Sequence, residues 1–313
     1  MKAVIFAEAG TLFGYGHLMR CLALAQGIKE RSVKVSFVIR GNGDFSELLS
    51  EFSYKQIEWL KSTNLKDFYN KNDIAVVDSY YADEILCREI YSGFKTVIFL
   101  DDYKRINYPG GYVLNGVIGA ERLKYPTSSN ITYLLGPRYQ PLRKEFWKVS
   151  EYVVRKNISS VMITFGGSDI TNKTSIYMKK VREFYSDADI TVIIGKGFKN
   201  INTIKEALDK KIELVYYPSA LRMRSIMLDS DLVISAAGQT ISELACVGIP
   251  TIGIQVADNQ KNNIRFWQEA NFLLTEKILE EDIDLFKRKM ISDNGRLIID
   301  GQGVRRIMDF LLC

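Results

Sequence analysis

The chain has 313 residues, of which 47% are hydrophobic and 25% are charged, and its net charge is +5. This is the composition of an ordinary globular protein with enough chain for two domains of about 150 residues each. No apolar run approaches the roughly 20 residues of a membrane helix, so stable membrane insertion is not expected. Acidic and basic residues are interspersed, which argues against a nucleic-acid-binding arm and is compatible with a small anionic substrate.

The four cysteines, Cys21, Cys87, Cys246 and Cys313, form no CxxC pair. We therefore expect small buried side chains in a reducing compartment and neither a disulfide framework nor a zinc site. The N-terminal stretch MKAVIFAEAG is too short for a signal peptide, which predicts a cytoplasmic protein. No metal or cofactor is expected, and the sequence does not indicate an oligomeric state.

Short apolar runs alternate with helical patterns along the whole chain. The runs are rich in Val, Ile and Phe without strict alternation, which is typical of parallel strands covered by helices on both faces. The predicted strands are residues 3–7, 33–39, 74–77, 96–100, 131–135, 161–165, 190–194, 212–216, 232–235 and 251–254.

Helical patterns separate these strands. Leu18, Cys21, Ala25 and Ile28 form one apolar stripe, and the pattern returns later in the chain. Strands alternating with helices predict right-handed βαβ units and the α/β class, with two Rossmann-like doubly wound parallel sheets facing a cleft. The further predicted helices are residues 220–228, 240–247 and 259–269.

The segment 136–159 breaks the alternation, because it opens with Gly-Pro and runs through a charged stretch. We place a domain boundary there, which gives an N-terminal domain of residues 1–150 and a C-terminal domain of residues 151–313. The last helix is a candidate to pack back on the first domain.

The first βα turn ends in Gly14-Tyr15-Gly16-His17. Glycines let a backbone approach a ligand closely, and the following helix start attracts negative charge. The third glycine of a dinucleotide fingerprint is missing. His17 is the only histidine, and imidazole exchanges a proton near neutral pH. A lone histidine is more often structural, but this one follows the first strand, where a crevice is expected, so both interpretations stay open.

Acidic side chains follow two more predicted strands. Asp78 precedes Ser79 and Tyr80, and Asp101 and Asp102 come after the next strand. The carboxyl ends of neighbouring parallel strands converge on one crevice. These aspartates either cap the next turn, or orient the histidine, stabilise positive charge at a sugar carbon, or bind a sugar hydroxyl or amide.

The C-terminal half has two further glycine-containing βα turns. Residues 166–168 (Gly-Gly-Ser) are suited to phosphate or sugar contacts, and Gly238 lets the backbone meet a pyrophosphate at a helix start. Glu243 stands three residues after Thr240, which is either a capping box or a carboxylate for the two ribose hydroxyls. Residues 258–260 cap another helix that points at the same cleft.

The segment GYGHLMRCLALA at residues 14–25 resembles the GxGHxxRCxxLA signature of the UDP-sugar hydrolases of pseudaminic acid biosynthesis. Those enzymes remove UDP from UDP-2,4-diacetamido-2,4,6-trideoxy-β-L-altrose. Spore-coat polysaccharide proteins are similar, and the whole group resembles GT-B glycosyltransferases of the MurG type. The stretches that agree in order are residues 77–80, 100–102, 135–139, 164–169, 231–243, 248–250 and 258–260.

The resemblance implies a GT-B-like fold with UDP held in the C-terminal domain, where Glu243 takes the ribose. It matches His17 to the catalytic histidine, for which Asp78 and Asp101 are the candidate assistants. The motifs and the resemblance together predict these substrate-binding residues: Gly14, Tyr15, Gly16, Arg20, Tyr80, Asp102, Gly166, Gly167, Ser168, Ala237, Gly238, Gln239, Thr240, Glu243, Asp258, Asn259 and Gln260.

The expected reaction is attack of water on the anomeric carbon of a UDP-linked amino sugar, with His17 as general base and inversion at that carbon. It would serve the synthesis of a pseudaminic-acid-type nonulosonate or a surface polysaccharide. A GT-B glycosyltransferase that passes the sugar to an acceptor is the alternative. A third hypothesis is a catalytically silent nucleotide-sugar-binding subunit.

Overall fold

The computed structural model describes residues 1–280 and 283–312; for Ser62, Asn259, Ile278 and Glu280 it describes the backbone alone. The chain forms two compact units. One contains Met1–Lys144 together with the C-terminal segment from Gly301, and the other contains Glu145–Asp300. The sequence placed this division near residue 150. Helix α9 (Gly303–Leu311) therefore belongs with the first unit.

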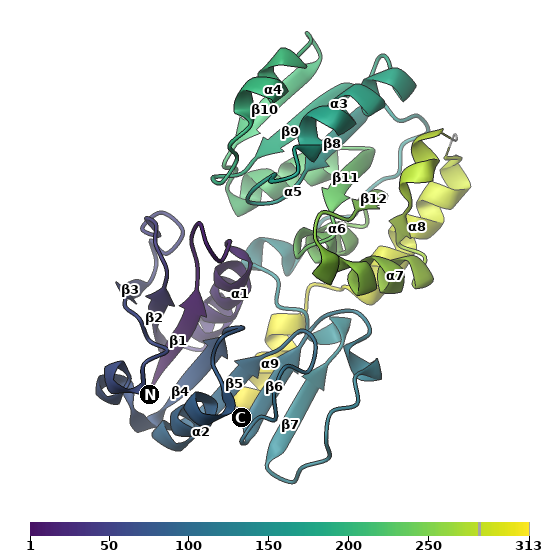
Figure 1. Ribbon diagram of the computed structural model, residues 1–313. Coiled ribbons are helices and arrows are strands. Elements are labelled where there is room, and N and C mark those ends of the chain that lie inside the picture. Colours follow the sequence, from purple (N-terminus) through teal and green to yellow (C-terminus); the bar gives the residue numbers. More distant parts are fainter. Residues whose placement is uncertain (281–282, 313) are drawn as a thin grey trace. The chain divides into compact units, whose positions relative to one another are not determined.

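The first unit contains a seven-stranded parallel sheet in the order β3-β2-β1-β4-β5-β6-β7 (Figure 1). Its central strands are buried on both faces, as their continuous apolar runs predict. The strands are β1 (Lys2–Glu8), β2 (Lys34–Arg40), β3 (Ser53–Gln56), β4 (Asn70–Asp78), β5 (Phe94–Leu100), β6 (Gly111–Asn115) and β7 (Ile131–Leu135).

Helices cover both faces of this sheet. Helix α1 (Gly16–Glu30) packs against β1 and side by side with α9, where a side chain on Gly27 would collide with Val304. Helix α2 (Glu84–Gly93) lies on the other face and places Leu86, Cys87 and Ile90 in a cluster with the sheet (Figure 1). The two faces follow from right-handed crossovers that run in opposite directions from the centre of the sheet.

The second unit contains a six-stranded parallel sheet in the order β10-β9-β8-β11-β12-β13. Its strands are β8 (Ser160–Thr164), β9 (Asp189–Ile194), β10 (Ile212–Tyr216), β11 (Leu232–Ala236), β12 (Thr251–Ile254) and β13 (Leu273–Leu274). Its helices are α3 (Lys173–Phe184), α4 (Ile201–Glu206), α5 (Ala220–Asp229), α6 (Thr240–Val247), α7 (Lys261–Glu269) and α8 (Leu285–Ile298).

Both sheets are doubly wound, so the predicted α/β class with two parallel sheets is confirmed. The strand order reverses between β1 and β4 in the first sheet and between β8 and β11 in the second. Ligands of such sheets bind at the carboxyl ends of the strands that flank this reversal. The fold therefore directs attention to the loops after β1 and β4, and after β8 and β11.

Across residues 1–280 and 283–312, no helix combines the length and the apolar character that crossing a membrane requires.

Candidate active site

The glycine turn after β1 (residues 10–16) leads directly into α1. Gly10 and Gly14 exchange two backbone hydrogen bonds, of 3.0 and 2.8 Å, which close the turn, and α1 begins at Gly16. In the first turns of α1, His17, Arg20 and Cys21 are three and four residues apart and so share one face. All three side chains are buried.

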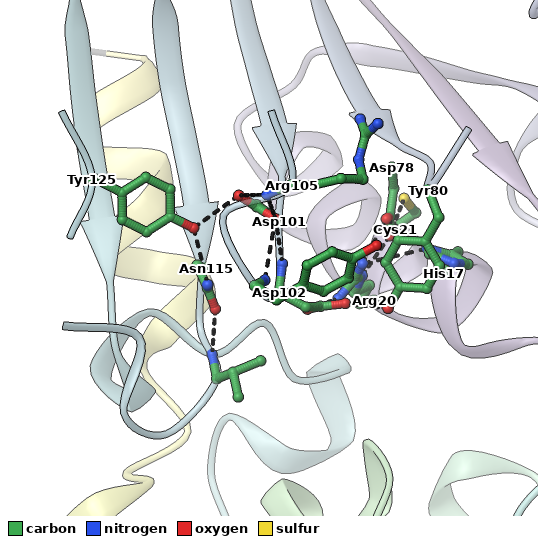
Figure 2. A network of polar contacts seen from close by, with 12 residues as sticks. His17, Arg20, Cys21, Asp78, Tyr80, Asp101, Asp102, Arg105, Asn115 and Tyr125 are labelled. Carbon is green, nitrogen blue, oxygen red and sulfur yellow. Dashed lines mark hydrogen bonds and ion pairs between the residues drawn. The ribbon is translucent and has the colours of Figure 1, made fainter. Parts of the chain in front are cut away.

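That face meets Asp78, the last residue of β4 and a fully buried carboxylate. Its Oδ1 lies 2.6 Å from His17 Nδ1 and accepts a hydrogen bond from Arg20 Nη2 at 2.7 Å. Its Oδ2 accepts from Arg20 Nε at 2.5 Å. Figure 2 shows the imidazole, the guanidinium and the carboxylate converging. The structure thus brings His17 and Asp78 together across a strand pair that flanks the reversal of strand order.

The partners of His17 fix its tautomer. An ionised carboxylate only accepts hydrogen bonds, so Nδ1 carries a hydrogen and donates it to Asp78. Arg20 Nη2 also lies 3.3 Å from His17 Nδ1, which is longer than the 2.6 Å between Nδ1 and Asp78. Nη2 already donates its hydrogen bond to the Asp78 carboxylate. The imidazole Nε2 is therefore left with a free lone pair, as a general base requires.

The charges around the imidazole are unbalanced when it is neutral. Arg20 also donates from Nη1 to Asp102 Oδ1 at 2.5 Å, so two carboxylates share one guanidinium. Burial alone would raise the pKa of Asp78, but the charges and hydrogen bonds of Arg20 and His17 hold it well below its usual range. With the imidazole neutral, the two carboxylates and the one guanidinium leave the network with one negative charge.

Tyr80 and Asp102 complete the network on its exposed side. The Tyr80 hydroxyl donates to Asp102 Oδ2, and the Tyr80 ring meets the His17 ring edge to face with centroids 4.4 Å apart. Burial and the charge of Asp102 raise the pKa of Tyr80 well above its usual range, so this phenol stays a donor. The Cys21 thiol donates to Asp78 at 3.7 Å, and burial raises its pKa well above its usual range, so it is no nucleophile.

Asp101, the other predicted catalytic carboxylate, is bound within its own loop. Its Oδ1 accepts from the backbone N–H of Asp102 at 2.8 Å and of Tyr103 at 3.2 Å, and its Oδ2 accepts from the Tyr125 hydroxyl at 2.9 Å. Figure 2 shows Asp101 on the side of Tyr125 and Asn115, apart from the imidazole. Of the two alternatives left open for the aspartates, Asp101 has the geometry of a turn cap.

Glu8, at the carboxyl end of β1, is a buried charged residue that the sequence did not single out. It is 0% exposed and accepts hydrogen bonds from Ser79 Oγ at 3.0 Å and from Arg40 Nη1 at 3.2 Å. Burial raises its pKa, an effect that Ser79, His17 and Arg40 oppose. A glutamate directly after a buried apolar strand was the available signal, because such residues are rarely fully buried without a reason.

The predicted contact residues of the glycine turn behave differently from one another. Tyr15 precedes α1 and packs its ring against Phe45 with centroids 6.3 Å apart. Gly14 needs its positive φ of 72°. Gly16 has no such φ, and a Cβ there would meet nothing within 4 Å. The folded protein alone does not explain why Gly16 lacks a side chain.

The predicted residues of the second unit lie at the other reversal of strand order. Gly166, Gly167 and Ser168 follow β8, and the Gly167 carbonyl accepts from the Gly197 N–H at 2.8 Å. Gly195 approaches so closely that a Cβ there would lie 2.4 Å from the Gly166 carbonyl oxygen. The turn is thus backed by a second glycine-containing turn.

Ala237, Gly238 and Gln239 connect β11 to α6, which begins at Thr240. The residue before the helix is Gln239, whose side chain makes no capping bond, so Thr240 does not occupy the N-cap position of the predicted capping box. A Cβ on Gly238 would meet nothing within 4 Å. Glu243 lies in the first turn of α6 and is partly exposed.

Residues 258–260 form one turn of 3-10 helix before α7. Asp258 is exposed, while Gln260 accepts the Val256 N–H at 2.9 Å and so holds its own loop. The side chain of Asn259 lies outside the described part of the chain. Asn263 Nδ2 donates to the Ala237 carbonyl at 2.9 Å, which ties α7 to the loop before α6.

No group of three or more His, Cys, Asp or Glu side chains arranged to hold a metal ion occurs among the described residues.

The two-sheet architecture is similar to that of several solved structures. MurG from Acinetobacter baumannii superimposes with a TM-score of 0.64 at 13% identity, over 99% of each chain. The fold is GT-B. A co-structure of MnaA from S. aureus with UDP gives a TM-score of 0.65 at 12% identity, over 99% of this chain and 96% of that one.

Sequence relatives agree with this GT-B assignment. Residues 160–282 match the model of the glycosyltransferase family 28 C-terminal domain. The spore coat polysaccharide biosynthesis protein SpsG of Bacillus subtilis is 23% identical over 99% of this chain and 98% of its own length. A Helicobacter pylori protein named as pseudaminic acid cytidylyltransferase and UDP-2,4-diacetamido-2,4,6-trideoxy-β-L-altropyranose hydrolase is 23% identical over 83% of this chain and 45% of its own length.

Proposed function

We propose that the protein hydrolyses a UDP-linked diacetamido-trideoxy hexose, releasing UDP by attack of water at the anomeric carbon with inversion. The observation that carries the proposal is the buried pair of His17 and Asp78. It leaves Nε2 of the imidazole as a lone base at the reversal of strand order in the first sheet. The name of the Helicobacter pylori relative supports both the substrate class and the reaction.

In this proposal His17 takes a proton from the attacking water, and the carboxylates next to it stabilise the positive charge of the imidazolium. A general base contributes about 10²–10⁴-fold to a rate. The two carboxylates of Asp78 and Asp102 and the one guanidinium of Arg20 have a net charge of one negative unit. When His17 takes the proton, the imidazolium that forms neutralises this charge. UDP needs little help as a leaving group, because its pyrophosphate spreads the negative charge that develops on departure.

The second unit would hold the nucleotide. The start of α6 at Thr240 offers the pyrophosphate a helix N-terminus and its favourable dipole, and Gly238 leaves open space beside it. The partly exposed Glu243 in the first turn of α6 would accept the ribose hydroxyls. Tyr217, which follows β10, is 47% exposed and has a backbone φ of 49°, a conformation rare outside functional sites and turns. We assign it to the nucleobase.

The test is incubation with UDP-linked amino sugars in the absence of any acceptor, followed by ³¹P and ¹H NMR. We expect UDP and a free sugar of inverted anomeric configuration from wild type. His17→Asn should still bind UDP and should lose turnover by about 10²–10⁴-fold. Turnover of that variant within a few-fold of wild type would exclude the imidazole as base.

A glycosyltransferase is the second candidate, favoured by the match of residues 160–282 to a glycosyltransferase family domain. The same network would then deprotonate an acceptor hydroxyl in place of water. The two functions differ in one observable. UDP release without acceptor supports the hydrolase, whereas release only after an acceptor is added supports the transferase. If the protein binds the nucleotide sugar but turns it over in neither assay, the result would support the third hypothesis, a catalytically silent binding subunit.

A further inference from the structure

A second polar cluster lies on the same loops as the His17 network and shares no hydrogen bond with it. At its centre is Arg40, the last residue of β2. Its guanidinium carbon lies 4.9 Å from the centroid of the Phe13 ring and 5.2 Å from that of Tyr81. The two rings meet edge to face with centroids 5.8 Å apart. One cation thus contacts rings on two loops, the glycine turn that precedes His17 and the segment after Asp78.

Buried and half-exposed carboxylates hold this cation in place. Arg40 Nη1 donates to Glu8 Oε1 at 3.2 Å, and Arg40 Nε lies 2.7 Å from Glu58 Oε1. Glu8 Oε1 also accepts the Ser79 hydroxyl at 3.0 Å. The Ser79 oxygen in turn accepts the backbone N–H of Tyr81 at 2.9 Å. The segment that carries Tyr81 is therefore tied to Arg40 both through its ring and through Glu8.

Glu8 supports a functional interpretation of this cluster. Its second oxygen, Oε2, is buried and has no hydrogen-bond partner among the described residues. A buried carboxylate that is only half satisfied is costly for the fold and calls for an explanation. Its other oxygen, Oε1, accepts from both Arg40 and Ser79, so Glu8 joins these two residues and the loops that they contact.

We propose that Arg40 is a positioning residue, which holds the glycine turn and the segment 79–82 in the arrangement that receives the sugar. This inference rests on the proposed function. Arg40 would act on binding more than on proton transfer, because Asp78 and Arg20 orient His17, and among the described residues the Arg40 cluster reaches the imidazole through the charge of Glu8 and not through a hydrogen bond. The loss of Arg40 should therefore loosen the surface against which the sugar lies and leave the base intact.

The experiment compares Arg40→Lys, Arg40→Met and Phe13→Leu with Lys55→Met. The control removes another cation–ring contact of the first unit, because Nζ of Lys55, on β3, lies 5.8 Å from the centroid of the Phe68 ring. We expect KM for the UDP sugar to rise about tenfold in all three test variants, with kcat within about threefold. Arg40→Lys should regain the stability that Arg40→Met loses and should not regain KM, because a lysine is a point charge without the flat guanidinium.

Hydrogen exchange on the free protein provides the second measurement. The test variants should lose amide protection in residues 10–16 and 79–82, and Lys55→Met should not. Unchanged KM and unchanged exchange in all three variants would overturn the proposal, as would a fall in kcat of more than tenfold at constant KM. If wild type turns over no nucleotide sugar, the proposed function fails, and the exchange data still decide whether Arg40 holds the loops.

Discussion

The substitution Gly16→Ala adds one methyl group, whose effect on folding can be measured separately from its effect on ligand binding. In the free protein a Cβ at this position meets nothing within 4 Å, and the backbone does not need a positive φ. Gly16 is also the first residue of α1, where alanine is preferred to glycine. Gly16→Ala should therefore stabilise the fold by about 0.4–1 kcal/mol, which raises the Tm by about 1–4 °C in a unit of this size.

The same methyl group should impair activity if a ligand lies against the turn. Forcing an extra methylene into a packed contact costs about 1–3 kcal/mol. This corresponds to a loss of roughly 5- to 150-fold in kcat/KM. The assay is steady-state UDP release together with thermal unfolding of the same samples. We expect opposite signs, a higher Tm and a lower kcat/KM.

Gly27→Ala is the matched control, because Gly27 lies in the same helix. A Cβ there would lie 2.3 Å from a Val304 methyl, at the contact of α1 with α9. It should lower the Tm and leave kcat/KM unchanged. If Gly16→Ala were at least as stable as wild type and equally active, no ligand would approach the turn at this point, and the interpretation of Gly16 would be refuted.

Three further predictions concern Asp78. Asp78→Asn should reduce turnover by about 10²–10⁴-fold in the UDP-release assay, because an amide can donate to Nδ1 and so favour the wrong tautomer. It should also destabilise the fold by about 3 kcal/mol in urea unfolding at pH 7, the lower end for breaking a buried ion pair, since Arg20 keeps Asp102 as a partner. The pKa of Asp78 is lowered in the folded state, so its contribution is fully present above pH of about 4 and is lost as the pH falls further. The stability difference between wild type and Asp78→Asn should therefore shrink below pH 4, and a constant difference down to pH 2 would contradict the ion pair.

Strong, two-sided burial made most of the fold predictable from sequence. Every predicted strand is present, because a buried parallel strand must be apolar along its whole length. The strands that were missed lack this signal. β3 at the sheet edge reads Ser-Tyr-Lys-Gln, β6 is short and begins at Gly111, and β13 has two residues. For such strands the neighbouring strand decides the conformation more than local propensity does.

The sequence predicted at which strand ends the candidate site lies, but not which of the side chains there contact one another. Position alone could not separate Asp78 from Asp101, since both follow buried strands next to each other in the sheet. The two aspartates differ in their contacts with α1, the helix after β1. His17 and Arg20 point at the end of β4, while the loop after β5 turns its own N–H groups onto Asp101. Such side-chain directions depend on tertiary packing, which a single sequence does not contain.

Gly238 provides the corresponding test in the second unit. A Cβ there meets nothing within 4 Å and no positive φ is required, so Gly238→Ala should fold like wild type. If the start of α6 holds the pyrophosphate, the variant should bind UDP at least tenfold more weakly by calorimetry, whereas His17→Asn should bind UDP like wild type. Gly248→Ala is the control, because Gly248 ends the same helix with φ of 85° and should cost stability without weakening UDP binding by the folded protein. Wild-type affinity of Gly238→Ala for UDP would mean that the nucleotide lies elsewhere, and the open space at Gly238 would then need a cause other than the ligand.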